Sequence, residues 1–218
     1  RTGSLRHGAT QSRQRASRLG PHFGIFLSRQ YDCRFQSHPS LGYGAGDLYD
    51  ISFMPVTLPY KEAEEPLGIH SRFSHADEAA SAGYYRVLLK DYGINVELTA
   101  TERCGIQRYT FPEADAAVIL NLRKAMNWDF TEDSYIEKVD SVTIQGYRFS
   151  DGWARGQRIF FRTRFSRPFE AMQLDSAAVL KDGKRIGTSV MVRFDFKTAK
   201  GEQLLVSTAI SKSEAKRS

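Results

Sequence analysis

INVELTA, residues 94–100, predicts the fold of this chain. Its apolar and polar residues alternate as in a half-buried strand, which places on one face Ile94, Val96 and Leu98. RIFFRTRFS, residues 158–166, has the same period. There the residues of one face are Ile159, Phe161, Thr163 and Phe165, and those of the opposite face are Phe160, Arg162 and Arg164. A period of two in both stretches predicts a sheet with one face on a core.

Further segments share the same enrichment in β-branched and aromatic residues. They are DLYDISFMPV (47–56), YYRVLLKDY (84–92), GIQRYTF (105–111), AAVILNL (116–122), KVDSVTIQGYRF (138–149), TSVMVRFDF (188–196) and QLLVSTAIS (203–211). Asp182-Gly183 predicts a hairpin turn, and helix is expected only as a turn or two within His75–Ala82. Many short strands with almost no helix predict an all-β fold, an antiparallel β-sandwich.

The length and composition suit a single folded domain. The chain has 218 residues, 41% of them hydrophobic, which is enough for one substantial core. No apolar run approaches the roughly 18 residues that a membrane span needs, so no membrane partner is expected. No signal peptide is present, but the chain starts at Arg1 rather than Met, and an upstream segment is therefore expected. With Cys33 and Cys104 as its two cysteines, a disulfide framework is not expected.

The net charge of +6 is confined to one segment. Residues 1–44 hold seven arginines against a single acid, Asp32, whereas residues 45–218 hold 24 basic and 24 acidic residues. A basic arm that binds nucleic acid would normally mix lysine with arginine, and this segment has no lysine. Nucleic acid is therefore not an expected partner.

Residues 1–44 also lack the hydrophobic rhythm of the rest, and a shifted reading frame accounts for this. With permitted codons and a shift of one base, residues 29–43 read DSTIVGFSHTHLSGT, and residues 5–20 permit PFGMVQLSPDNG. One base supplied near the codons of Gly42 and Gly44 joins this text to AGDLYDISFMP. The sequence thus predicts an out-of-frame or disordered segment over 1–44, poorly packed and without regular strand pairing, followed by a sandwich over 45–218.

Four stretches of the body resemble one family. GDLYDISFMP, SRFSHADEAASAGYYRVLLKDYGINVELTATERCGIQRYTFPE (71–113), YRFSDGWARGQRIFFRTRFSRPFE (147–170) and TAKGEQLLVSTAIS (198–211) resemble the amino-terminal β-sandwich of glycoside hydrolase family 92, the α-mannosidases. The shifted frame resembles the same family, with PFGMVQLSPD and GFSHTHLSGTG in the corresponding place. The resemblance implies a supersandwich of the galactose-mutarotase-like type.

The resemblance further implies a part of an exo-acting, calcium-dependent enzyme that hydrolyses α-mannosides with inversion. The catalytic carboxylates and the calcium site of the family belong to a helical carboxy-terminal domain, and this chain is expected to stop before it. We therefore expect no catalytic residue, no metal site and no cofactor in this fragment, and no activity of the fragment alone. Its expected partners are α-mannoside glycans and that catalytic domain, in a parent enzyme that is periplasmic or secreted.

Arg72 and His75, in SRFSHADE, are candidates for contacts to sugar hydroxyls. The same polar segment also has a structural interpretation. Ser74 precedes Asp77 by three residues, as in a capping box, so the segment could simply cap a helical turn. No His or Cys pair here has the spacing of metal ligands.

Trp153 and Asp47 are the other candidates. Trp153 lies in a glycine-flanked loop, where an indole can stack on a sugar face or plug the end of a sandwich. Asp47 adjoins the segment expected to reach the sugar, although Asp47 and Asp50 at a strand start also suit a turn. The leading interpretation is a non-catalytic domain that helps to form the sugar site, and the alternative is a free-standing carbohydrate-binding module.

The frame hypothesis makes a direct prediction about the DNA. Resequencing across the codons of Gly42 to Ala45 should recover one additional base, after which the upstream text reads as the family-like string. Finding no additional base in independent reads of both strands would refute the hypothesis.

Overall fold

The computed structural model describes residues 22–23, 25–27, 51–60, 69–123, 130–152, 155–174, 179–181, 184–188 and 190–213. Its strands are β1 (His22–Phe23), β2 (Ile25–Leu27), β3 (Ile51–Thr57), β4 (Ser71–Arg72), β5 (Ala79–Ser81), β6 (Tyr84–Leu89), β7 (Ile94–Ala100), β8 (Cys104–Thr110), β9 (Ala114–Asn121), β10 (Phe130–Lys138), β11 (Thr143–Asp151), β12 (Gln157–Phe165), β13 (Ala171–Leu174), β14 (Val179–Lys181), β15 (Lys184–Gly187), β16 (Met191–Thr198) and β17 (Gln203–Ser211). One 3-10 helix, η1, covers His75–Asp77. The all-β prediction is confirmed.

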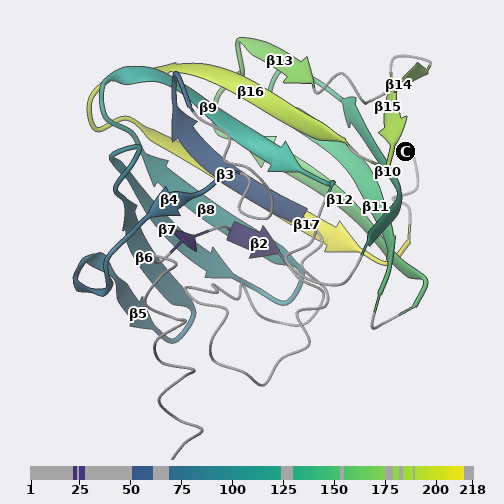
Figure 1. The fold of residues 1–218 in the computed structure, drawn as a ribbon, viewed down its shortest axis with the longest axis horizontal. Coiled ribbons are helices and arrows are strands. Elements are labelled where there is room, and N and C mark those ends of the chain that lie inside the picture. The colour runs from purple at the N-terminus through teal and green to yellow at the C-terminus, as the bar shows by residue number, and fades with distance from the viewer. Residues whose placement is uncertain are drawn as a thin grey trace, which may run out of the picture.

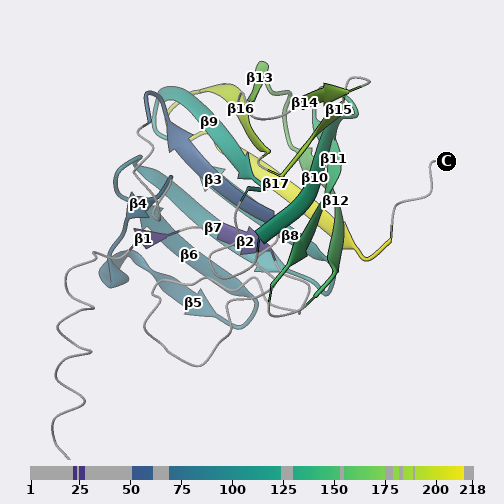
Figure 2. The ribbon, with the colours of Figure 1, turned by 45° about the vertical axis from the view of Figure 1, so that its right-hand side comes forward.

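The strands form two antiparallel sheets that stack as a sandwich, as Figures 1 and 2 show. The larger sheet has the order β14-β15-β10-β11-β12-β17-β8-β7-β6-β5, and the smaller has the order β13-β16-β9-β3-β2. A short pair, β1 with β4, lies beside them. Neighbours such as β12 and β17 are far apart in sequence, so the fold depends on long-range pairing.

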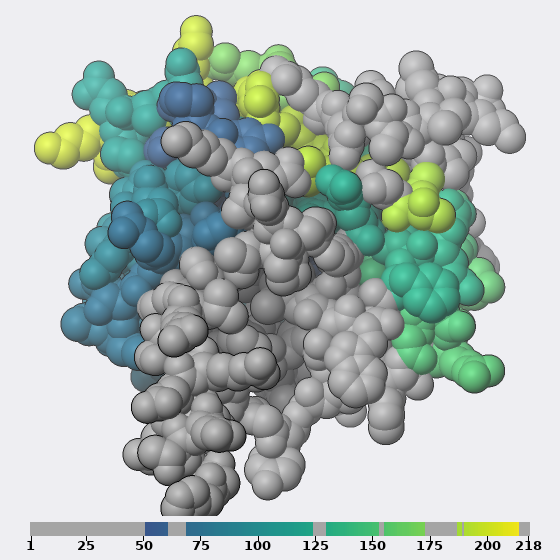
Figure 3. All heavy atoms as spheres, viewed as in Figure 1, coloured from purple at the N-terminus to yellow at the C-terminus, as the bar shows by residue number. Residues whose placement is uncertain are grey.

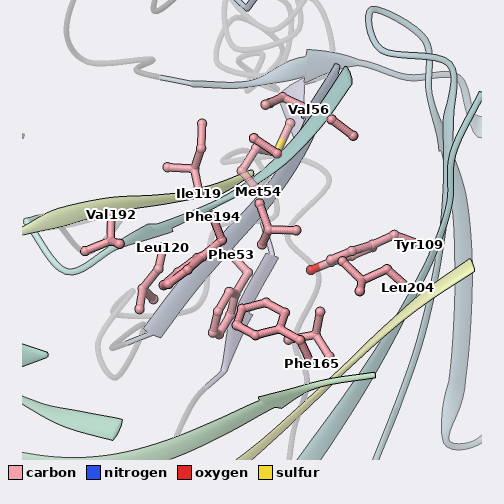
Figure 4. Close-up of a cluster of buried hydrophobic side chains, with 14 of the residues drawn as sticks. Phe53, Met54, Val56, Tyr109, Ile119, Leu120, Phe165, Val192, Phe194 and Leu204 are labelled. Carbon is pink, nitrogen blue, oxygen red and sulfur yellow. The ribbon is translucent and has the colours of Figure 1, made fainter. Parts of the chain in front are cut away.

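The core lies between the sheets, and the alternation of the sequence fills it as expected. Ile94, Val96 and Leu98 of β7 are buried, as are the four residues of β12 predicted to share a face. Phe165 of the larger sheet lies 5.1 Å from Phe194 and 5.6 Å from Phe196 of the smaller, ring centre to ring centre. Figure 4 draws Phe53 from β3 and Phe165 among the buried side chains of this core.

The smaller sheet buries side chains on both of its faces at β3 and β9. Phe53 pairs with Leu120 on the face toward the larger sheet, and Met54 pairs with Ile119 on the other. All four are at most 4% exposed. A run of consecutive apolar residues in β9, from Ala116 to Leu120, suits such two-sided burial.

Arg148 of β11 is fully buried between the sheets, an unusual place for a charged side chain. Its Nε donates to the Leu122 carbonyl at 3.2 Å and to Thr131 Oγ1 at 3.0 Å. The Thr131 hydroxyl in turn donates to the same carbonyl at 2.8 Å. These bonds tie β10 and β11 to the segment after β9, and they satisfy donors that burial removes from water.

Two details depart from the sequence predictions, and one is confirmed. The expected strand 138–149 begins only at Thr143, as β11, because Lys138 is the last residue of β10 and a turn separates the two strands; β10 itself was not predicted. Its inward positions include Thr131 and Ser134, so its apolar alternation is weak. The expected hairpin is confirmed by its flanking strands, since Lys181 pairs with Lys184, while residues 182–183 lie outside the described part.

The expectation that residues 1–44 lack regular strand pairing is wrong for five of them. His22 and Phe23 pair with β4, and Ile25–Leu27 pair with β3. The remainder of that segment lies outside the described residues. Within the described ranges, no helix is long and apolar enough to cross a membrane.

The contact between the sheets predicts a strong stability effect at Phe165. We expect Phe165→Ala to lower the free energy of unfolding by about 3–5 kcal/mol, because it leaves a cavity where the two sheets meet. Phe165→Leu should cost less, since it refills part of that cavity. Chemical denaturation measures both values.

Phe130 supplies the matched control, because it is 59% exposed on the same sheet. Phe130→Ala should change the free energy of unfolding by less than about 1 kcal/mol. Equal effects at Phe130 and Phe165 would contradict this description of the core.

Candidate functional site

The structure places two of the four predicted site residues close together in sequence and space. Arg72 ends β4, and His75 opens η1 three residues later. Their side chains are 72% and 70% exposed, so both can reach a ligand. Asp47 and Trp153 lie outside the described residues, and their candidacy stays a prediction.

Ser74 positions His75 by capping η1, as the sequence suggested. It has extended backbone angles, and its hydroxyl accepts a hydrogen bond from the Ala76 N–H at 3.3 Å. The reciprocal half of a capping box is not formed in the way expected, because the Asp77 carboxylate pairs with Lys90 at 3.0 Å. The observed 3-10 turn is shorter than the predicted one and gives way to β5 at Ala79.

Arg72 is held by Asp91 through two bonds. Its Nε donates to Asp91 Oδ1 and its backbone N–H donates to Oδ2, each at 2.7 Å. Burial acts to raise the pKa of the Asp91 carboxyl, but the backbone and guanidinium hydrogen bonds of Arg72 outweigh it and hold that pKa below its ordinary value. Asp91 therefore stays ionised and fixes the direction of the arginine.

His75 is held by a second carboxylate, that of Glu78. His75 Nδ1 contacts Glu78 Oε2, while the Tyr85 hydroxyl donates to Glu78 Oε1. Burial, with a further contribution from that bond, raises the pKa of the Tyr85 hydroxyl, which thus remains a donor. The His75 ring also meets Phe73 edge to face, with 5.6 Å between ring centres.

The arrangement suits recognition better than bond cleavage. Arg72 and His75 present exposed nitrogens whose other contacts fix them in place, which is the property that orienting hydrogen bonds require. The nearby carboxylates of Glu78 and Asp91 are already engaged by these groups and by Tyr85. This cluster can bind hydroxyls without itself supplying an acid and a base.

Glu78 lies in the same polar segment of the sequence as His75, but the distant partners Asp91 and Lys90 could not be found from the sequence. Asp91 and Lys90 follow β6, about twenty residues after Arg72 in the sequence. They lie beside Arg72 because the Lys90 N–H donates to the Arg72 carbonyl at 2.9 Å. That pairing depends on how β4 lies beside the end of β6. In the ranges that the structure describes, no group of three or more His, Cys, Asp or Glu side chains could hold a metal ion.

The comparisons with known proteins agree with this fold. The family model of the glycosyl hydrolase family 92 amino-terminal domain matches residues 35–211, and so begins ten residues before the expected boundary at 45. No protein of curated function matches the chain.

Several solved structures are similar to the chain. A family GH92 α-mannosidase from Bacteroides thetaiotaomicron, solved with mannoimidazole, is 30% identical over 76% of this chain, with a TM-score of 0.68. An inverting GH92 mannosidase from the same organism is 21% identical over 75% of the chain, with a TM-score of 0.60, and supports the fold alone. The chain spans 24% and 22% of their respective lengths.

The lowered pKa of Asp91 predicts a pH-dependent contribution to stability. A carboxyl whose pKa falls on folding stabilises the fold above its unfolded pKa, and this contribution is lost as the pH drops through the folded value, here below 3.8. At pH 7 we expect Asp91→Asn to lower the free energy of unfolding by about 0.5–1 kcal/mol, since the pair is largely solvated.

Urea denaturation at several pH values measures this contribution. The difference between wild type and Asp91→Asn should shrink toward acid, whereas the exposed Glu113→Gln should show little difference at any pH. If the loss of unfolding free energy in Asp91→Asn stays constant down to acid pH, the charge of Asp91 is not the cause of that loss.

Proposed function

Because the chain belongs to glycosyl hydrolase family 92 through its amino-terminal domain, we propose that it is the non-catalytic part of an exo-acting α-mannosidase. In this proposal, the catalytic domain follows in the same polypeptide and packs on the sandwich. The substrate is an α-mannoside at the end of a glycan.

One observation carries this proposal. The family match covers residues 35–211, and the 30% identical relative described as an α-mannosidase is about four times as long as the part that this chain matches. A domain that makes up about one quarter of an enzyme is better suited to support an active site in the rest of the chain than to form the whole active site by itself. The engaged carboxylates near Arg72 and His75 agree with a supporting role.

Arg72 and His75 are proposed to donate hydrogen bonds to mannose hydroxyls at the interface between the two domains. Both are exposed, and Asp91 and Glu78 fix their directions. Asp47 and Trp153 are proposed to complete this wall, the first through its carboxylate and the second by stacking on the sugar. Each such contact positions the glycosidic bond without taking part in its cleavage.

The proposed chemistry is hydrolysis with inversion. One carboxylic acid protonates the leaving oxygen, and a carboxylate on the opposite face of the ring activates water. Both groups are proposed to come from the catalytic domain, as is calcium. The described residues of this chain do not fit a calcium site, because they contain no cluster of three or more acidic, His or Cys side chains. A periplasmic or secreted location and a role in N-glycan processing would suit such an enzyme.

The downstream DNA and the two exposed side chains test the proposal together. The reading frame past Ser218 should encode a family 92 catalytic domain. In the longest product of that frame, Arg72→Ala and His75→Ala should each raise the KM for an α-mannobiose about tenfold, the effect of one lost hydrogen bond. This chain alone should show no hydrolysis.

Arg164→Ala is the matched control, because Arg164 is exposed on β12 of the larger sheet, away from β4 and η1. It should leave kcat and KM unchanged, and thermal unfolding should show that each variant is folded. A stop codon at Ser218 followed by unrelated sequence would count against the proposal. Tight binding of mannan by the chain alone, with no catalytic domain encoded, would favour a free-standing carbohydrate-binding module.

A further inference from the structure

A concave surface lies on the outer face of the larger sheet, across β10, β11, β12 and β17. It is a groove of about 240 Å³. The strand order places β8 and β7 between this groove and β6, next to which Arg72 and His75 lie. Figure 3 draws the segment from 69 to 100, in blue, and the segment from 130 to 165, in green, on opposite sides of the molecule.

The lining of this groove, here called the β11 groove, includes three half-buried aromatic rings from neighbouring strands. Tyr135, Tyr147 and Phe160 contribute them. The ring of Tyr147 is centred 5.2 Å from that of Tyr135 and 5.8 Å from that of Phe160, and it stacks on Phe149 at 4.2 Å. The Tyr147 hydroxyl donates to Asp133 at 2.8 Å, which fixes the ring plane.

Polar side chains of three kinds accompany these rings. Gln145 Nε2 donates to Glu137 Oε1, so an amide and a carboxylate are held side by side in the groove. Arg162 lines it as an exposed guanidinium that has no bonded partner among the described residues. Glu137 and Arg162 carry opposite charges, so the groove as a whole favours a neutral ligand.

Cross-strand packing explains the rings but not the whole groove. Aromatic pairs on neighbouring strands stabilise a sheet, and such a role needs no open volume. Here the rings line a groove together with a carboxylate, an amide and a guanidinium. A pyranose ring has an apolar C–H face that stacks on aromatic rings and a rim of hydroxyls that match such planar polar groups.

We propose that the β11 groove binds a neutral sugar residue of an oligosaccharide, at a site separate from the one around Arg72 and His75. Phe160 stacks on the apolar face of the sugar, and Tyr147, whose ring is inclined by 62° to that of Phe160, contacts its edge. Arg162 donates to its hydroxyls, and Glu137 accepts from them. The site binds without chemistry and would hold a glycan on the sandwich. It does not depend on the role proposed for Arg72 and His75.

Amide spectra of the full 218-residue chain, titrated with α-1,2-mannobiose, maltose and cellobiose, test this site. At least one disaccharide should shift the amide resonances of Tyr147, Phe160 and Ile210. Phe160→Ala and Arg162→Ala should weaken that binding about tenfold or more, through lost stacking and a lost hydrogen bond. Phe160→Tyr should retain it, because the ring remains.

Leu205→Ala is the matched control, because Leu205 is 44% exposed on β17 and lies outside the groove lining. It should leave the affinity unchanged. Absence of shifts with every disaccharide would overturn the proposal and favour coverage of the groove by protein. Shifts confined to the surroundings of Arg72 and His75, or an affinity that Phe160→Ala does not change, would overturn it as well while leaving the α-mannosidase role intact.

Discussion

The packing of Phe165 against Phe194 and Phe196 is the contact on which the sandwich depends, because it joins the larger sheet to the smaller. Neither sheet would be stable with the apolar side chains of its inner face exposed to water. The larger one lines that face with residues such as Ile159 and Phe161, and the smaller one with Phe53. The cluster around Arg72 and His75 and the β11 groove both lie on outer faces or edges of the sheets, which this packing leaves exposed.

The sequence predicted the fold where side chains alternate clearly and missed it where they do not. The alternation in 94–100 and in 159–165 matches the buried positions. Strand β10 was missed because its inward face uses Thr131 and Ser134, which look like surface residues in a sequence. Arg148 would be placed on the surface by the same rule. Its burial depends on acceptors at Leu122 and Thr131, which only the folded chain brings together.

The sequence predicted which residues belong to the candidate site, but not how they are arranged in space. Arg72 and His75 were identified from a polar segment, and the structure shows that Asp91 and Glu78 hold them. Asp91 becomes a neighbour of Arg72 through the placement of β4 beside the end of β6, a long-range contact without a local signal, whereas Glu78 is only three residues from His75. The β11 groove did have a local signal in the sequence. Phe160 is an aromatic residue on the face of β12 that otherwise carries arginines.

Strand β12 therefore serves two surfaces with alternate residues. Its inward series ends in Phe165, and its outward series places Phe160 and Arg162 at the groove. A slip of one residue in a strand exchanges its two faces. Inserting or deleting one residue within β12 would send Arg162 toward the core and Phe161 toward solvent at the same time. A change in the length of β12 therefore disrupts the groove and the core together, whereas a substitution at a single position can alter one of them without the other.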